Sequence, residues 1–109
     1  MTLREKQSVF MRMVGQLIAK AYELGYELTG GDLLSSPTYR TAAGKMPHKA
    51  NSLHYDKLAI DLNLFYKGEY LTKTEDHKKL GEYWESIGGS WGGRFNDGNH
   101  YSLEHNGRK

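Results

Sequence analysis

The feature that most constrains this chain is an alternating run over residues 58–65, in which one carboxylate interrupts an apolar pattern. Leucine and isoleucine take every second position of the run: Leu58, Ile60, Leu62 and Leu64. A period of two predicts a strand with one face in a core. Asp61 lies inside this strand, where a carboxylate is costly unless it is paired or bound to a metal. The run therefore predicts a central strand that carries a polar site.

Two histidines suggest what the carboxylate of Asp61 is for. His54 lies seven positions before Asp61, and His100 lies in a segment rich in Gly and Asn. Two imidazoles and one carboxylate form a three-ligand zinc set, with the fourth position left for water. The chain has no Cys, so any zinc must be held by His and carboxylates. Either histidine alone is more often exposed or structural than a ligand.

The spacing of these residues carries a specific resemblance. Ser-x-His-x-x-x-x-Ala-x-Asp from Ser52, followed by Asp-x-x-His from Asp97, resembles the zinc peptidases of the D-alanyl-D-alanine carboxypeptidase and L-alanyl-D-glutamate endopeptidase family. The phage endolysins of that family are the most similar. The resemblance spans about residues 26–104. One departure is Lys57, where the family usually has Gly; it changes a turn and not a ligand.

The resemblance implies roles for five residues and for one metal ion. His54, Asp61 and His100 bind Zn²⁺, Asp97 is the catalytic acid/base, and Arg40 faces the active site from a Tyr-Arg-Thr element. A zinc ion in an open site lowers the pKa of its bound water to ~7 and polarises the scissile carbonyl.

Asp97 and Arg40 each have a simpler interpretation as well. Asp97 precedes Gly98, and Asp-Gly is common in turns; a tight turn and a general base are compatible, because a turn can aim a carboxylate. Arg40 is either a solvated loop residue or a cation that stabilises an oxyanion or binds a substrate carboxylate. An Asp-x-x-His element, rather than Glu-x-x-His, resembles the endopeptidase branch of the family.

The rest of the chain predicts a small α+β fold, with an antiparallel sheet that carries the zinc site and helices packed on one side. Thr2 and Glu5 form a capping box at the start of the first helix. The expected elements are a helix over 3–24 ended by Gly25, a short strand over 26–29, a long loop over 33–52, the strand over 58–65, a turn over 66–70, a helix over 75–87 with Thr74 as N-cap, and a strand over 100–103. His77 is expected on a solvated face of the second helix.

Length and charge set the remaining expectations. We expect residues 1–109 to form a single catalytic zinc peptidase domain and to act as a monomer. A net charge of +2 is too weak to indicate nucleic-acid binding. No window holds the ~18 apolar residues of a membrane span, so we expect no membrane insertion.

The expected function is that of a phage-type endolysin, which hydrolyses the L-alanyl-D-glutamate bond of peptidoglycan stem peptides. A D-alanyl-D-alanine carboxypeptidase is the alternative on the same scaffold. A non-catalytic, zinc-stabilised domain that binds cell wall or belongs to a virion is a third. Residues 1–24 lack a signal peptide, so we expect the protein in the host cytoplasm until a membrane lesion releases it to the wall.

Overall fold

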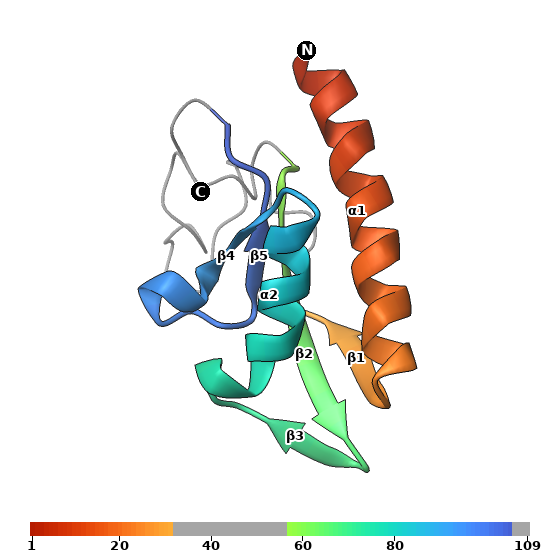
Figure 1. The fold of residues 1–109 in the computed structure, drawn as a ribbon, viewed down its shortest axis with the longest axis vertical. Coiled ribbons are helices and arrows are strands. Elements are labelled where there is room, and N and C mark those ends of the chain that lie inside the picture. Colours follow the sequence, from red (N-terminus) through yellow and green to blue (C-terminus); the bar gives the residue numbers. More distant parts are fainter. Residues whose placement is uncertain (32–56, 106–109) are drawn as a thin grey trace, which may run out of the picture.

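The computed structural model describes residues 1–31 and 57–105, and these form helices and an antiparallel sheet (Figure 1). The elements in chain order are α1 (Leu3–Glu23), β1 (Tyr26–Gly30), β2 (Ala59–Tyr66), β3 (Glu69–Leu71), the 3₁₀ helix η1 (Thr74–His77), α2 (Lys78–Ser86), β4 (Ser90–Trp91), the 3₁₀ helix η2 (Gly92–Phe95) and β5 (His100–Ser102). The predicted α+β class is confirmed. Neither α1 nor α2 combines the length and apolar content that crossing a membrane requires.

The first helix begins and ends as its sequence predicts. The Thr2 hydroxyl accepts a hydrogen bond from the Glu5 amide at 3.1 Å, and the Glu5 carboxylate accepts one from the Thr2 amide at 2.9 Å. These two bonds satisfy backbone donors that a helix N-terminus otherwise leaves unpaired. Gly25 follows the helix with a φ of 91°, which a residue without Cβ adopts easily. The capping box and the glycine stop are confirmed.

Strand β2 is the centre of the sheet. One edge of β2 pairs with β1, in a register that runs from Tyr26 opposite Tyr66 to Gly30 opposite Leu62. Its other edge is divided, because the start of β2 pairs with β5 and its end pairs with β3. Strand β4 continues the sheet beyond β5. The divided edge leaves a gap in the ladder between β3 and β5.

The two faces of β2 differ as the alternation predicts. Ile60, Leu62 and Leu64 are buried and join a core cluster with residues of α1 and α2. In that core, the Trp84 ring makes edge contacts with Phe10 and Tyr101, at centroid distances of 5.7 and 6.0 Å. The intervening side chains Asp61, Asn63 and Phe65 are half-buried on the opposite face. The polar face of β2 therefore points away from the helical core.

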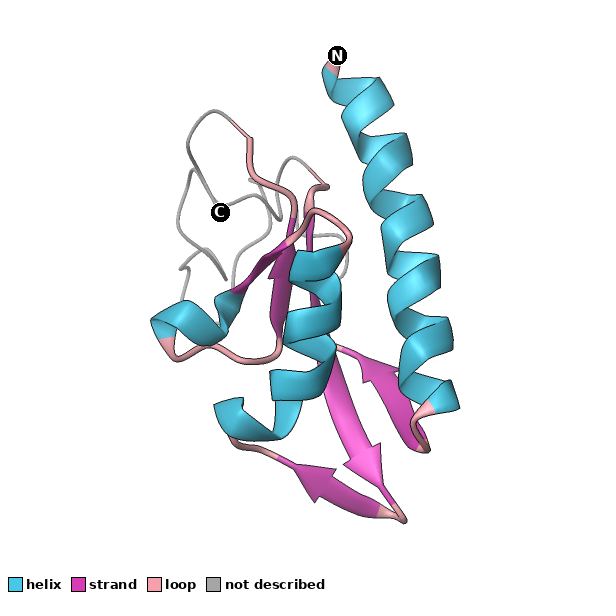
Figure 2. Ribbon diagram, in the orientation of Figure 1, coloured by secondary structure: helices cyan, strands magenta, loops and turns pink. Residues whose placement is uncertain are grey.

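Strands β2 and β3 form a hairpin at one end of the molecule (Figure 2). Its turn residues Lys67 and Gly68 have φ angles of 50° and 81°. Two consecutive positive φ angles are typical of the tight turn whose twist matches the flanking strands. The predicted turn over 66–70 is confirmed.

The start of the second helix differs from the prediction. Thr74 is not the N-cap of an α-helix, because residues Thr74–His77 form a 3₁₀ turn before α2. The Thr74 hydroxyl instead accepts a hydrogen bond from the Gly98 amide at 3.2 Å. The Asp76 carboxylate accepts a hydrogen bond from the Lys73 amide at 3.0 Å and so caps the turn. Thr74 is thus used to hold a distant loop.

The prediction that His77 lies on a solvated face is wrong. Its side chain is 3% exposed, and its Nδ1 lies 2.8 Å from the Tyr101 hydroxyl. Burial lowers the pKa of His77, because desolvation disfavours the charged imidazolium. The 3₁₀ turn has about three residues per turn rather than 3.6, so it directs His77 away from the face expected for a continuous α-helix.

We expect Lys57→Gly to stabilise the protein. Lys57 precedes β2 with a φ of 59°, in the left-handed region. A side chain in that region destabilises the folded state by ~1–2 kcal/mol, and Gly removes this cost. The gain is reduced by ~0.5–1 kcal/mol, because Gly loses more conformational entropy on folding. The free energy of unfolding in urea should therefore rise by up to ~1.5 kcal/mol. Lys57→Ala is the control, because it keeps Cβ and should not be stabilised. Equal stability of the Gly and Ala variants would contradict the backbone explanation.

Candidate active site

The sheet register brings Asp61 and His100 together, although they are 39 positions apart. The two residues are directly opposite each other on β2 and β5. The Asp61 Oδ1 lies 3.2 Å from the His100 Nδ1, and the two side chains are 19% and 14% exposed. Directly opposite residues of an antiparallel pair place their side chains on the same face. The polar residue of the alternating run therefore has its partner on the neighbouring strand.

The Asp61–His100 pair has the chemistry and spacing of two zinc ligands. Ligand atoms bound at about 2.1 Å to one tetrahedral zinc lie roughly 3.4 Å apart. The observed 3.2 Å is close to this value, and the nitrogen and oxygen donors suit Zn²⁺. The same distance also fits a direct hydrogen bond between the two side chains.

The third predicted ligand, His54, lies outside the described residues, and so does Arg40. Within residues 1–31 and 57–105, no group of three or more His, Asp or Glu side chains is placed to hold a metal ion. The roles of His54 and Arg40 therefore stay predictions.

Asp97 begins a tight turn that leads into β5. The His100 amide donates a hydrogen bond to the Asp97 carbonyl at 3.1 Å, and the Asp97 amide donates one to the Gly92 carbonyl at 2.9 Å. The turn expected from the Asp-Gly pair is present, and the Asp97 side chain is exposed. The turn places Asp97 three residues before His100 at one end of β5, with a carboxylate open to solvent.

Contacts from neighbouring elements hold this turn and the 3₁₀ helix η2 that precedes it. The Trp91 indole of β4 donates a hydrogen bond to the Gly98 carbonyl at 2.8 Å, and Thr74 of η1 accepts from the Gly98 amide. Arg94 of η2 donates to both carboxylate oxygens of Glu85 on α2, at 2.8 and 3.0 Å. The segment that carries Asp97 and leads to His100 is thus fixed by bonds to the strand before it and to the helices around it.

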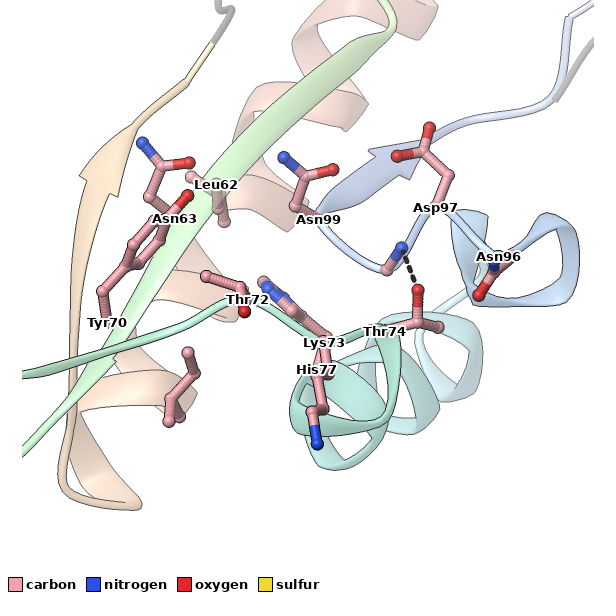
Figure 3. Close-up of a pocket in the computed structure, with 12 residues that line it drawn as sticks. Leu62, Asn63, Tyr70, Thr72, Lys73, Thr74, His77, Asn96, Asp97 and Asn99 are labelled. Carbon is pink, nitrogen blue, oxygen red and sulfur yellow. Dashed lines mark hydrogen bonds between the residues drawn. The ribbon is translucent and has the colours of Figure 1, made fainter.

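A polar pocket of about 180 Å³ adjoins the pair, at the divided edge of β2 where β3 and β5 diverge (Figure 3). Its lining residues include Leu62 and Asn99, which neighbour Asp61 and His100 in the chain, and Asp97 itself. The side chains of Asn63, Asn99 and Asp97 point to the same side in Figure 3. The pocket therefore offers amide and carboxylate groups beside the candidate ligands.

Two residues of this region, Asn63 and Asn99, were missed by sequence analysis. Asn63 could have been predicted from the sequence, because the period of two places it on the same face of the strand as Asp61. Asn99 could not have been predicted, because its position depends on the Asp97–His100 turn. Tyr101 is completely buried and bonded to His77, so it belongs to the core beneath the site and not to the pocket wall. Desolvation raises the pKa of Tyr101, which keeps the phenol neutral.

Comparison with known protein families places the chain beside one group of peptidases. The family model described as D-alanyl-D-alanine carboxypeptidase matches residues 46–103, just over half of the 109-residue chain. The matched span contains His54, Asp61, Asp97 and His100, and Arg40 lies before it. No curated protein sequence matches the chain significantly.

We expect Gly92→Ala to damage the candidate site. A Cβ at this position would overlap the Asp97 carbonyl oxygen and the Cβ of His100. The backbone must then shift, so the variant should lose ~1–3 kcal/mol of unfolding free energy. Its zinc affinity should fall as well. Gly15→Ala is the matched control, because no atom lies near a Cβ there and Ala favours a helix by ~0.5–1 kcal/mol. Unchanged stability and zinc affinity in Gly92→Ala would show that the turn tolerates displacement.

Proposed function

Because the chain belongs to the D-alanyl-D-alanine carboxypeptidase family, we propose that it is a phage-type endolysin that cleaves the L-alanyl-D-glutamate bond of stem peptides. Membership of this family makes it a peptidase that acts on peptidoglycan, and the family is generally zinc-dependent. The observation that carries the proposal is the Asp61–His100 pair at 3.2 Å beside a pocket that Asp97 lines.

In the proposed centre, His54, Asp61 and His100 hold one zinc ion. Bound there, zinc supplies a Lewis acid that activates water and polarises the scissile carbonyl. Asp61 and His100 contribute a carboxylate and an imidazole from adjacent strands, so their relative position is set by a backbone ladder rather than by a loop. A ligand pair on strands is held more accurately than one on loops.

Asp97 acts as the general acid/base in this proposal. Its exposed carboxylate accepts a proton from the attacking water and returns it to the leaving amine. The bonds that hold the turn use the backbone of Asp97, so its carboxylate is left for proton transfer. Arg40 would bind a substrate carboxylate or stabilise the oxyanion.

A D-alanyl-D-alanine carboxypeptidase is the second candidate, because the matching family model carries that description. The Asp-x-x-His form of the last element favours the endopeptidase. The non-catalytic alternative is less well supported, because the chain keeps a residue for each predicted role: His54, Asp61, His100, Asp97 and Arg40.

Digestion of purified cell walls tests the proposal directly. We expect mass spectrometry of the soluble products to show peptides with a new N-terminal D-glutamate, and walls that retain L-alanine. His100→Ala should lose both bound zinc and product, because it removes one of three ligands. Release of single D-alanine residues would instead identify a carboxypeptidase. Wall binding without any cleaved product would identify a binding domain.

Asp97→Asn separates an acid/base role from metal binding. The amide keeps the size of the side chain and cannot accept the proton, so activity on cell walls should fall by ~10²–10⁴. Zinc content and melting temperature should change little, because the contacts of the turn come from the backbone of Asp97. Glu82→Gln is the control, since it removes an exposed carboxylate on α2 and should leave activity unchanged. Loss of zinc in Asp97→Asn would make Asp97 a ligand.

A further inference from the structure

An aromatic pair lies on the hairpin beside the candidate site. Phe65 of β2 and Tyr70 of β3 are directly opposite in the strand register. Their rings are stacked, with centroids 5.1 Å apart and an interplanar angle of 26°. Tyr70 is 53% exposed. The pair therefore presents an aromatic surface to solvent.

This aromatic surface is on the same face of the sheet as the candidate ligands. Phe65, Asn63 and Asp61 alternate along β2 and so share a face. Tyr70 lines the pocket together with Asn63 and Asp97, and its ring lies beside Asn63 in Figure 3. At ~3.3 Å per residue, Asn63 is about 7 Å and Phe65 about 13 Å from Asp61 along the strand. A row of amide and aromatic groups thus leads away from the Asp61–His100 pair.

The chemistry of this row suits a sugar ring. An aromatic face packs against the C–H groups on one side of a pyranose, and the Asn63 amide can donate to and accept from hydroxyl and N-acetyl groups. On the basis of the proposed function, we propose that Phe65, Tyr70 and Asn63 bind the N-acetylated pyranose to which the stem peptide is attached. The substrate is then a sugar-bearing stem peptide rather than a free peptide.

The length of the substrate fits this position. Alanine and the lactyl group separate the L-alanyl-D-glutamate carbonyl from the sugar, and each is about as long as one extended residue. The near and far edges of the ring therefore lie roughly 7 and 10 Å from the scissile carbonyl. This range falls between Asn63 and Phe65. The D-alanyl-D-alanine bond is three residues further along the stem peptide, so its sugar would lie roughly 17–20 Å from the scissile carbonyl, beyond the aromatic pair.

Phe65 and Tyr70 also stabilise the hairpin as a cross-strand pair, and the test must separate the two roles. We would measure kcat/KM on two substrates with the same stem peptide, one carrying N-acetylmuramic acid and one carrying an acetyl group in its place. The parent protein should prefer the sugar-bearing substrate roughly three- to tenfold, the contribution expected from one aromatic stack. Tyr70→Ala should remove this preference, mainly through KM, so that kcat/KM falls more on the sugar-bearing substrate than on the acetylated peptide.

Two control variants test whether the effect depends on the aromatic ring at position 70. Tyr70→Phe keeps the ring and should keep the preference. Tyr66→Ala removes an exposed ring from the next position of β2, on the other face, and should also keep it. Equal loss on both substrates in Tyr70→Ala would show a structural role and overturn the inference, as would a parent protein that cleaves both substrates equally well. Those outcomes leave the proposed function intact, whereas no cleavage of either substrate would overturn the function and this inference together.

Discussion

The pairing of β2 with β5 is the constraint on which the candidate site depends. It places Asp61 opposite His100 and brings a carboxylate within 3.2 Å of an imidazole. A slip of one residue in either strand would turn one of these side chains toward the core. The core opposes such a slip, because Ile60 and Tyr101 alternate with the site residues and are buried on the other face. The packing that stabilises the sheet therefore also sets the spacing of the two predicted ligands.

The divided edge of β2 explains why a pocket adjoins this pair. One strand edge cannot pair with β3 and β5 at the same residues, so the ladder is interrupted around Leu62 and Asn63. The Leu62 amide donates a hydrogen bond to the carbonyl of Asn99, the residue just before β5, at 2.9 Å. This bond extends the pairing of β2 by one residue beyond the β5 ladder. The polar groups of the surrounding loops then line the gap. A cavity at such an interruption is a product of topology, and its polar lining suits a peptide with many hydrogen-bonding groups.

The turn before β5 shows how a short loop is held without a large core of its own. Trp91 and Thr74 bond to the two backbone groups of Gly98, and glycine is needed there because a Cβ would meet the backbone of Thr74. Gly92 similarly allows its own backbone to approach Asp97 and His100. Glycine at these two positions permits close approach, while the bonds from neighbouring elements supply the rigidity that glycine lacks. An exposed carboxylate can thereby sit on a firmly held backbone.

Local patterns in the sequence determined the first helix, the central strand and the polar identity of the site. The Thr2 capping box and the alternation around Asp61 act over a few residues, so they can be read directly. Tertiary structure alone decided which residues meet across the chain. His77 is buried because η1 directs it toward Tyr101, and Thr74 binds Gly98 rather than capping a helix. Ligand chemistry and a family resemblance suggested that Asp61 and His100 meet, but no local pattern predicted their pairing, because strand register depends on packing across the whole sheet.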